Sequence, residues 1–158
     1  MKKKPRNLLI LIVLLIALGG ILLVNRVYLL ELENTSHPRA VRVRIEPTET
    51  FVVFYVDSVT NESVVEELKA ERDGIILMGV KTKGQAIKEY YGFENFKEFH
   101  PVNLKLGAIF FRVGVGEGQG LVVRDRKIYM SEVGAQGDRI RLRVQSVSRG
   151  RYLLSQLF

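Results

Sequence analysis

The sequence predicts an all-β domain, an antiparallel sandwich or small barrel of about eight or nine strands, preceded by one N-terminal transmembrane helix. Residues 8–24 form an unbroken apolar run, and beyond Asn25 hydrophobicity alternates with a period of two residues, as in half-buried strands. Turn signals also recur about every ten residues. We therefore divide the chain into a basic cytoplasmic tail (1–7), a membrane helix (8–24) and an extracytoplasmic β domain (25–158).

The membrane segment runs from Leu8 through Leu15 to Val24, 17 residues without a charge, an amide or a hydroxyl. As an α-helix it would be about 26 Å long, close to the roughly 30 Å hydrocarbon core of a bilayer. A cleaved signal peptide is the alternative, but its apolar core would be about 7–15 residues long, followed by a small-x-small cleavage site. No such site follows Val24, so we favour an uncleaved anchor. A buried helix is disfavoured because no face of the segment is polar.

The positive charges before the apolar run predict its orientation. Lys2, Lys3, Lys4 and Arg6 precede the run, and the first acidic residue is Glu31. Basic residues favour the cytoplasmic side of a membrane, and a large following domain is translocated largely regardless of its charge. We therefore expect a single-pass protein of the cell membrane, with the lipid bilayer as its first partner and its C-terminal domain outside the cytoplasm.

The composition excludes several classes of function. The chain has 158 residues, with 24 Lys and Arg, 17 Asp and Glu, and no cysteine. Without cysteine there are no disulfides, thiolate metal sites, cysteine nucleophiles or lipidated N-terminal cysteine. Four basic residues lie in the tail, and the others are interleaved with acids, which argues against a nucleic-acid partner.

Alternation and turn residues place the strands of the β domain. In residues 41–46 Val and Ile alternate with Arg and Glu, and in residues 139–144 Ile, Leu and Val alternate with Arg. Asp73-Gly74 between two apolar runs is a good hairpin signal. The other expected strands are residues 27–33, 50–59, 64–71, 74–81, 105–114, 120–124 and 127–130.

Two segments are ambiguous. Residues 63–74 contain good helix formers, but the β-branched start and the Asp-Gly turn favour a strand. Residues 84–102 are rich in Tyr and Phe at spacings that match neither period. We expect a short helix there, followed by an aromatic-rich loop that packs over one end of the sheet.

Motifs for catalysis, metal binding or cofactor binding are weak or missing. His37 and His100 stand beside prolines in expected loops, with no partner at metal-ligand spacing. The glycines of residues 114–120 precede a strand-like segment, whereas a dinucleotide fingerprint needs a helix there, so we expect a flexible hairpin. Glu66 and Glu67 would face opposite ways on a strand. We therefore predict no catalytic residue, no metal and no cofactor, and we do not expect an enzyme.

Glu66 is the most informative polar residue. Alternation places it on the same face as Val64 and Leu68, and a carboxylate on an apolar face needs partners. Asp57 and Ser58 lie across the expected turn and could supply them. We predict that these residues face each other across a hairpin. They would form either a buried polar network that fixes the hairpin, which we favour, or a small polar ligand site.

The same stretch carries a resemblance to a family. It rests on the segments Tyr55-Val56-Asp57-Ser58-Val59, Ser63-Val64-Val65-Glu66, Asp73-Gly74-Ile75-Ile76-Leu77, Thr82-Lys83-Gly84 and the closing LRVQSV, and it covers roughly residues 27–146. The chain resembles a bacterial and archaeal domain-of-unknown-function family of small membrane-anchored proteins, often encoded beside TRAP transporters of the TAXI type. Asp57 and Ser63 stand where the family pattern has His and Pro.

The resemblance implies an accessory or regulatory part in the uptake of a small organic solute. The partner would be a multi-span transporter subunit or its solute-binding protein. The candidate polar or ligand site comprises Tyr55, Asp57, Ser58, Glu66 and Gly84. The alternative is an envelope protein with a small-ligand-binding or structural β domain unrelated to transport.

Overall fold

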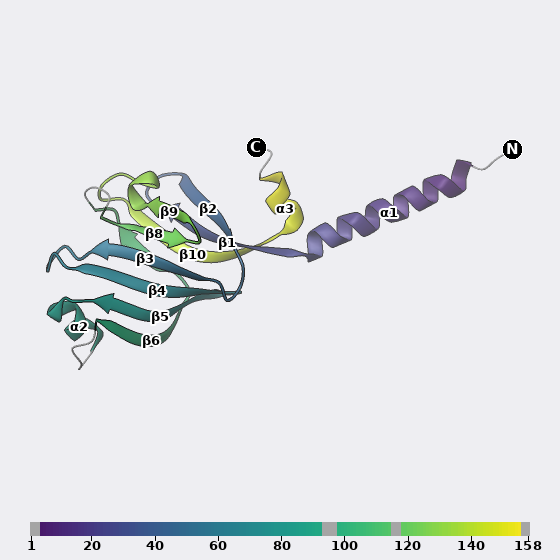
Figure 1. The fold of residues 1–158 in the computed structure, drawn as a ribbon. Coiled ribbons are helices and arrows are strands. Elements are labelled where there is room, and N and C mark those ends of the chain that lie inside the picture. The colour runs from purple at the N-terminus through teal and green to yellow at the C-terminus, as the bar shows by residue number, and fades with distance from the viewer. Residues whose placement is uncertain (1–3, 93–97, 115–117, 156–158) are drawn as a thin grey trace.

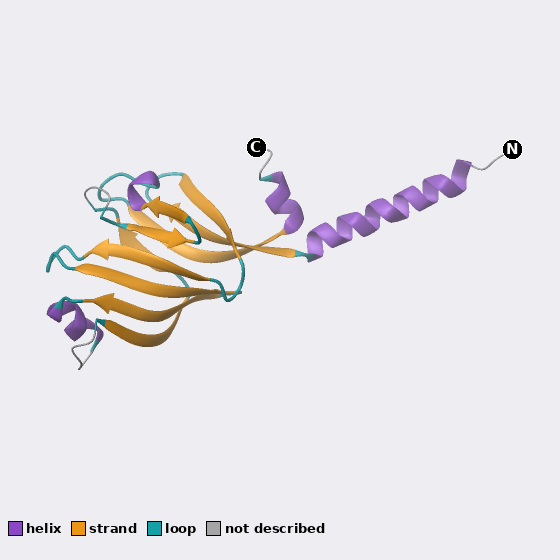
Figure 2. Ribbon diagram, viewed as in Figure 1, coloured by secondary structure: helices purple, strands orange, loops and turns teal. Residues whose placement is uncertain are grey.

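The computed structural model describes residues 4–92, 98–114 and 118–155. These residues form ten strands in two antiparallel sheets that stack as a β-sandwich, together with a long N-terminal helix and short helical segments. Figure 1 shows the N-terminal helix projecting away from the sandwich, and Figure 2 shows that strands dominate the rest. The predicted all-β fold is therefore confirmed, as a sandwich and not the alternative small barrel, and the described residues form ten strands where about eight or nine were expected.

The smaller sheet has four strands in the order β2-β1-β10-β7. The strands are β1 (Arg26–Asn34), β2 (Arg39–Ile45), β7 (Ile109–Arg112) and β10 (Arg139–Ser148). β1 pairs with β10 along its whole length, from Arg26 opposite Ser148 to Asn34 opposite Ile140. The beginning and the end of the domain are thereby held side by side.

The larger sheet has six strands in the order β6-β5-β4-β3-β8-β9. The strands are β3 (Thr50–Val56), β4 (Ser63–Glu71), β5 (Gly74–Thr82), β6 (Phe99–Leu106), β8 (Gly120–Val123) and β9 (Arg126–Tyr129). β4 is a strand, as the Asp73-Gly74 signal predicted, and its Val64, Glu66 and Leu68 share the buried face.

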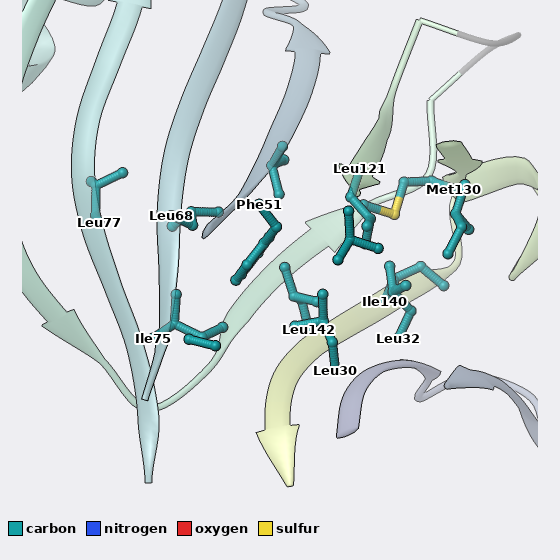
Figure 3. Close-up of a cluster of buried hydrophobic side chains, with 14 of the residues drawn as sticks. Leu30, Leu32, Phe51, Leu68, Ile75, Leu77, Leu121, Met130, Ile140 and Leu142 are labelled. Carbon is teal, nitrogen blue, oxygen red and sulfur yellow. The ribbon is translucent and has the colours of Figure 1, made fainter. Parts of the chain in front are cut away.

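The hydrophobic core lies between the sheets because alternation gives each sheet one apolar face. In Figure 3 Leu30 and Leu142 of the smaller sheet lie opposite Phe51 and Ile75 of the larger one. These four side chains are at most 2% exposed, and burial of each contributes about 1.5–3 kcal/mol. The inward faces of the two sheets therefore hold the domain together.

The helices occupy the two ends of the sandwich (Figure 1). They are α1 (Lys4–Val24), α2 (Gln85–Tyr91) and α3 (Arg149–Leu154), and a 3₁₀ turn, η1, covers Met130–Glu132. α2 ends at Gly92, whose φ of 73° is the left-handed conformation that favours glycine at this position. α3 is capped by Ser148, whose side chain accepts a hydrogen bond from the Arg151 N–H, and it lies beside the end of α1, where Gly150 faces Leu22.

The apolar side chains of α1 are exposed along the helix. Thirteen of the large apolar residues between Leu8 and Val24 are 44–77% exposed, whereas Leu22, beside α3, is less exposed. Within the part of the chain that the structure describes, no helix is both long and apolar enough to count as a membrane span on hydropathy.

Several expected elements have different boundaries. The expected strand 105–114 is divided between β6 and β7, because the chain leaves one sheet at Gly107 and joins the other. β6 begins at Phe99, so the end of the segment expected to be an aromatic loop belongs to a strand. His100, which was expected in a loop, is buried in this strand. β3 ends at Val56, three residues earlier than expected.

Other expectations fall on residues that the structure does not describe. These are Lys2 and Lys3 of the basic tail, residues 93–97 of the aromatic segment and residues 115–117 of the glycine-rich hairpin. The short helix expected at the start of the aromatic segment is confirmed as α2.

Candidate functional site

A buried carboxylate joins β3, β4 and α2. Glu66 on the inner face of β4 is 7% exposed, and its Oε1 accepts hydrogen bonds from the Tyr55 hydroxyl at 3.0 Å and from the Tyr91 hydroxyl at 2.8 Å. Tyr55 reaches it diagonally, since Glu66 pairs with Val53 and Tyr55 pairs with Val64 in the ladder. Tyr91 comes from the last turn of α2. The two tyrosines therefore satisfy the carboxylate and tie α2 to the sheet.

Both phenols of this cluster are held in the protonated form. Burial, reinforced by the negative charge of Glu66, raises the pKa of Tyr55 and also the pKa of Tyr91 well above the ordinary value of 10.0. The hydroxyls therefore act as hydrogen-bond donors to Glu66 at any physiological pH, and neither is poised to act as a base.

Asp57 organises the turn between β3 and β4. Its Oδ1 accepts hydrogen bonds from the backbone N–H of Thr60 at 2.8 Å, from the Thr60 hydroxyl at 2.9 Å and from the Val59 N–H at 3.1 Å. The Thr60 N–H, followed by the Thr60 hydroxyl, lowers the pKa of Asp57 below its ordinary value. Asp57 is therefore a carboxylate that shapes its own turn, with Asn61 completing it at a φ of 56°.

The expected network of Asp57, Ser58 and Glu66 does not form as predicted. No hydrogen bond among the described residues joins Glu66 to Asp57 or Ser58, and Ser58 is exposed. Glu66 pairs with Val53, and Asp57 lies four residues further along, or about 13 Å of extended strand. Glu66 is instead part of a buried network with tyrosines, so the expectation of a partnered carboxylate holds while the partners differ.

Gly84 allows the β3–β4 turn to approach α2. It lies immediately before α2, and a Cβ added there would lie 2.9 Å from Cγ of Glu62 and 3.2 Å from Cγ1 of Ile87. Its N–H donates to the Thr82 hydroxyl at 3.1 Å. Because glycine has no side chain, the turn and the helix can pack closely and enclose the space between them.

That space is a hollow of about 420 Å³, which we call the distal hollow. Its lining residues are Tyr55, Asp57, Val59, Thr60, Ala86, Ile87, Tyr90 and Tyr91. It lies between the β3–β4 turn and α2, at the end of the sandwich opposite α1 (Figure 1). Two of its tyrosines also bind Glu66, so the buried network fixes one wall of the hollow.

The chemistry of the distal hollow favours an apolar or cationic group. Tyr90 and Tyr91 meet edge to face with ring centroids 5.3 Å apart, and Tyr90 is 83% exposed. Asp57 is the charged residue of the lining, and Lys, Arg and His are not among the described lining residues. Aromatic faces beside a carboxylate attract cations, whereas an organic anion would find no positive partner there.

Sequence reasoning missed the role of Tyr90 and Tyr91. The sequence shows the aromatic segment, but nothing in it assigns Tyr91 to Glu66, which is 25 positions away. The available signal was the spacing of Ile87 and Tyr91, one helical turn apart, which places both on one face of α2. In the described ranges no three His, Cys, Asp or Glu side chains gather closely enough to hold a metal ion.

Comparisons with protein-family models, with curated proteins and with solved structures found no match for this chain. Inferences about its function therefore rest on its own geometry and sequence.

Proposed function

We propose that this chain is a membrane-anchored binding protein on the outer side of the cytoplasmic membrane and an accessory protein of a TRAP-type transporter of the TAXI class. In this proposal α1 anchors the protein and the distal hollow engages the solute-binding protein of the transporter. The observation that carries the proposal is the exposed apolar surface of α1, which covers no part of the sandwich core.

The exposure of α1 is unfavourable in water. Thirteen large apolar side chains between Leu8 and Val24 are at least 44% exposed, and each Å² of such surface costs about 25 cal/mol in water. The hydrocarbon core of a bilayer removes that cost. A 17-residue apolar run is at the short limit of membrane helices, which span about 17–25 residues, and local thinning of the bilayer accommodates a short span.

The position of the distal hollow supports a partner that is itself outside the membrane. α1 leaves the sandwich at one end, and the hollow is at the other (Figure 1). Anchoring would confine the encounter to a layer next to the membrane and raise the effective concentration of the partners. The link to a TRAP transporter is supported by the sequence resemblance at Ser58, Val59 and Glu66.

The anchor is tested by fractionation of the full-length chain. We expect the chain to stay in the membrane fraction after an alkaline wash. Protease added to spheroplasts should digest a C-terminal tag, because the domain is proposed to lie outside the cytoplasm. Leu15→Arg combined with Ile16→Arg should release the chain, since each Arg costs about 2.5–3.5 kcal/mol at the centre of a membrane helix. Leu15→Ile with Ile16→Leu is the matched control. Recovery of the wild type from the aqueous fraction would contradict the anchor.

The partner is tested by site-specific photo-crosslinking in native membranes. A photoreactive residue at Tyr90, which is 83% exposed, should capture the solute-binding protein of the transporter. The same residue at Phe110, which is 49% exposed on the smaller sheet, is the control and should not capture it. Equal yields from the two positions, or capture of no transport component, would contradict the proposed partner.

A second candidate function is direct binding of a small ligand, unrelated to transport. The volume of the distal hollow and its tyrosine rings favour this candidate, with a quaternary or primary amine as the ligand. We would then expect choline to raise the melting temperature of the detergent-solubilised chain and glutamate to leave it unchanged. Tyr90→Ala should abolish the shift, whereas Tyr152→Ala, outside the hollow, should not.

A further inference from the structure

A second hollow lies at the end of the sandwich next to α1, and we call it the junction hollow. Its volume is about 400 Å³, and it is lined by Asn25, Arg26, Val27, Arg44, Arg149, Tyr152 and Leu153. Three of these residues are arginines, and among the described lining residues none is acidic. We propose that the junction hollow binds the phosphate of an anionic phospholipid of the outer leaflet. This proposal rests on the membrane anchorage proposed for α1.

The junction is built by the pairing of the two ends of the domain. Asn25 follows directly after α1, and its carbonyl accepts a hydrogen bond from the Arg149 N–H at 2.8 Å. Arg26 then begins β1 opposite Ser148, the last residue of β10. These contacts bring Arg26 and Arg149 together, although they are far apart in the sequence, and place both at the end of the membrane helix.

Most of the positive charge of the junction hollow has no acidic partner among the described residues. Within the described residues neither Arg26 nor Arg149 has a carboxylate partner, and Arg44 shares one exposed contact with Glu46 through Nη2 at 2.9 Å. A neighbouring hollow on the same sheet differs, since it is lined by both Arg and Glu, and Arg143 there is paired with Glu31. The junction hollow is therefore the better site for an added anion.

Guanidinium groups fit a phosphate because each presents several N–H donors in a planar fork. The apolar neighbours fit the remainder of a phospholipid. Leu153 lines the hollow and is 46% exposed, and α3 packs beside the end of α1 at Leu22. Tyr152 completes the lining, and tyrosine is enriched at membrane interfaces. The phosphate would thus lie among the arginines, with the acyl chains running along α1.

The test uses the full-length chain and a choice of lipids. Native mass spectrometry of the chain, released from vesicles of phosphatidylcholine and phosphatidylglycerol in equal amounts, measures which lipid it retains. We expect a preference of about tenfold for phosphatidylglycerol, because three basic groups at a membrane surface act together. The variant Arg26→Gln/Arg44→Gln/Arg149→Gln should lose this preference.

The control variant is Arg72→Gln/Arg112→Gln/Arg139→Gln, which removes the same charge from exposed positions outside the hollow. It should keep the preference. Equal losses in the two variants would overturn the proposal, because they would indicate general attraction of a basic domain. A third outcome would assign the hollow to free phosphate and overturn the lipid assignment. In that outcome the wild type shows no lipid preference, but inorganic phosphate raises its melting temperature. The Arg26/Arg44/Arg149 variant loses this rise, and the control variant keeps it. The proposal is also overturned if the wild type shows neither a lipid preference nor a rise in melting temperature with phosphate.

The anchor is measured separately, so that the two proposals can fail independently. Retention of the chain in vesicles of phosphatidylcholine alone, after an alkaline wash, depends on α1 and not on the arginines. Loss of retention there contradicts the anchor, whereas normal retention without lipid preference contradicts only the phosphate site.

Discussion

At the scale of single residues, Glu66 shows why a charged group is tolerated on the inner face of a strand. Its Oε1 receives two hydroxyl hydrogen bonds, from Tyr55 and Tyr91, so the carboxylate replaces lost water with fixed donors. The same two bonds connect the sheet to α2. The residue therefore serves both the stability of the fold and the shape of the distal hollow.

Glu66→Ala should destabilise the folded chain by roughly 1–3 kcal/mol, because it leaves two partly buried hydroxyls without an acceptor. Chemical denaturation of the full-length chain in detergent measures the change. The matched control is Glu67→Ala on the exposed face of β4, which should change the free energy of unfolding by less than about 0.5 kcal/mol. Equal effects of the two substitutions would contradict the role given to Glu66.

Glu31 is a second buried carboxylate, on the outer face of the smaller sheet. It pairs in the ladder with Arg42 on one side and Arg143 on the other, at N–O distances of 2.7 Å to each. Burial alone would raise the pKa of Glu31, but the hydrogen bonds from Arg143 and Arg42 outweigh it and hold the pKa below the ordinary value of 4.5.

A lowered pKa predicts a direction for the pH dependence of stability. The stabilising contribution of Glu31 should be fully present above about pH 4.5 and should be lost as the pH falls through its folded-state pKa. Thermal melts of the full-length chain between pH 7 and pH 3 measure this loss. Glu31→Gln should lower the melting temperature at pH 7 and reduce its further fall in acid, whereas Glu67→Gln should leave the wild-type profile. If the melting temperature of Glu31→Gln falls between pH 7 and pH 3 as much as that of the wild type, this role of Glu31 is contradicted.

At the scale of elements, the hairpin of β8 and β9 depends on a close approach of two strands. Gly120 in β8 is buried between the β9 backbone and the ring of Phe54 in β3. A Cβ at Gly120 would lie 2.5 Å from the carbonyl oxygen of Ile128 and 2.7 Å from the Phe54 ring. Because the first of these atoms belongs to the backbone, the strands themselves would have to move apart.

Gly120→Ala should therefore destabilise the domain by about 1–3 kcal/mol, the usual cost of overpacking. Gly118→Ala is the control, since its Cβ would make an ordinary contact at 3.6 Å with Val56. Denaturation of the two variants beside the wild type measures the difference. Wild-type stability in Gly120→Ala would show that β9 shifts without cost and would refute the packing argument.

At the scale of the whole molecule, the helix α1 and the sandwich are structurally separate. The core cluster consists of residues from the sheets, α2 and the connecting segments, and none of the described side chains of α1 belongs to it. The contacts of α1 with the domain are at its C-terminal end, where Leu22 lies beside Gly150 of α3. The fold of the domain therefore does not require the helix.

Deletion of residues 1–24 should leave a folded domain with one cooperative unfolding transition. Because no core contact is lost, its free energy of unfolding should lie within about 1 kcal/mol of that of the full-length chain. Denaturation followed by circular dichroism compares the two, with the detergent kept the same. Loss of the cooperative transition on deletion would mean that α1 is part of the fold.

The sequence was sufficient to predict an all-β domain, its alternating strands and the buried position of Glu66, but it did not decide between a sandwich and a small barrel. These features depend on local periodicity, which places Val64, Glu66 and Leu68 on one face whatever the rest of the chain does. The change of sheet at Gly107 could not be predicted in this way, because the pattern of residues 105–114 is compatible with one strand or two.

The contacts between residues that are distant in the sequence follow from the packing of the sheets and helices. The sequence predicts a contact between Glu66 and Asp57 across the β3–β4 turn. In the structure Glu66 pairs with Val53, four residues before Asp57, which corresponds to about 13 Å of extended strand. The hydrogen bonds to Glu66 come instead from Tyr55 and Tyr91. Tyr55 lies on β3, two residues beyond Val53, which is the ladder partner of Glu66, and Tyr91 lies on α2. Which face of each strand is buried can be predicted from the sequence, because it follows from the periodicity of apolar residues. The two hollows depend on which elements the packing of the sheets brings together.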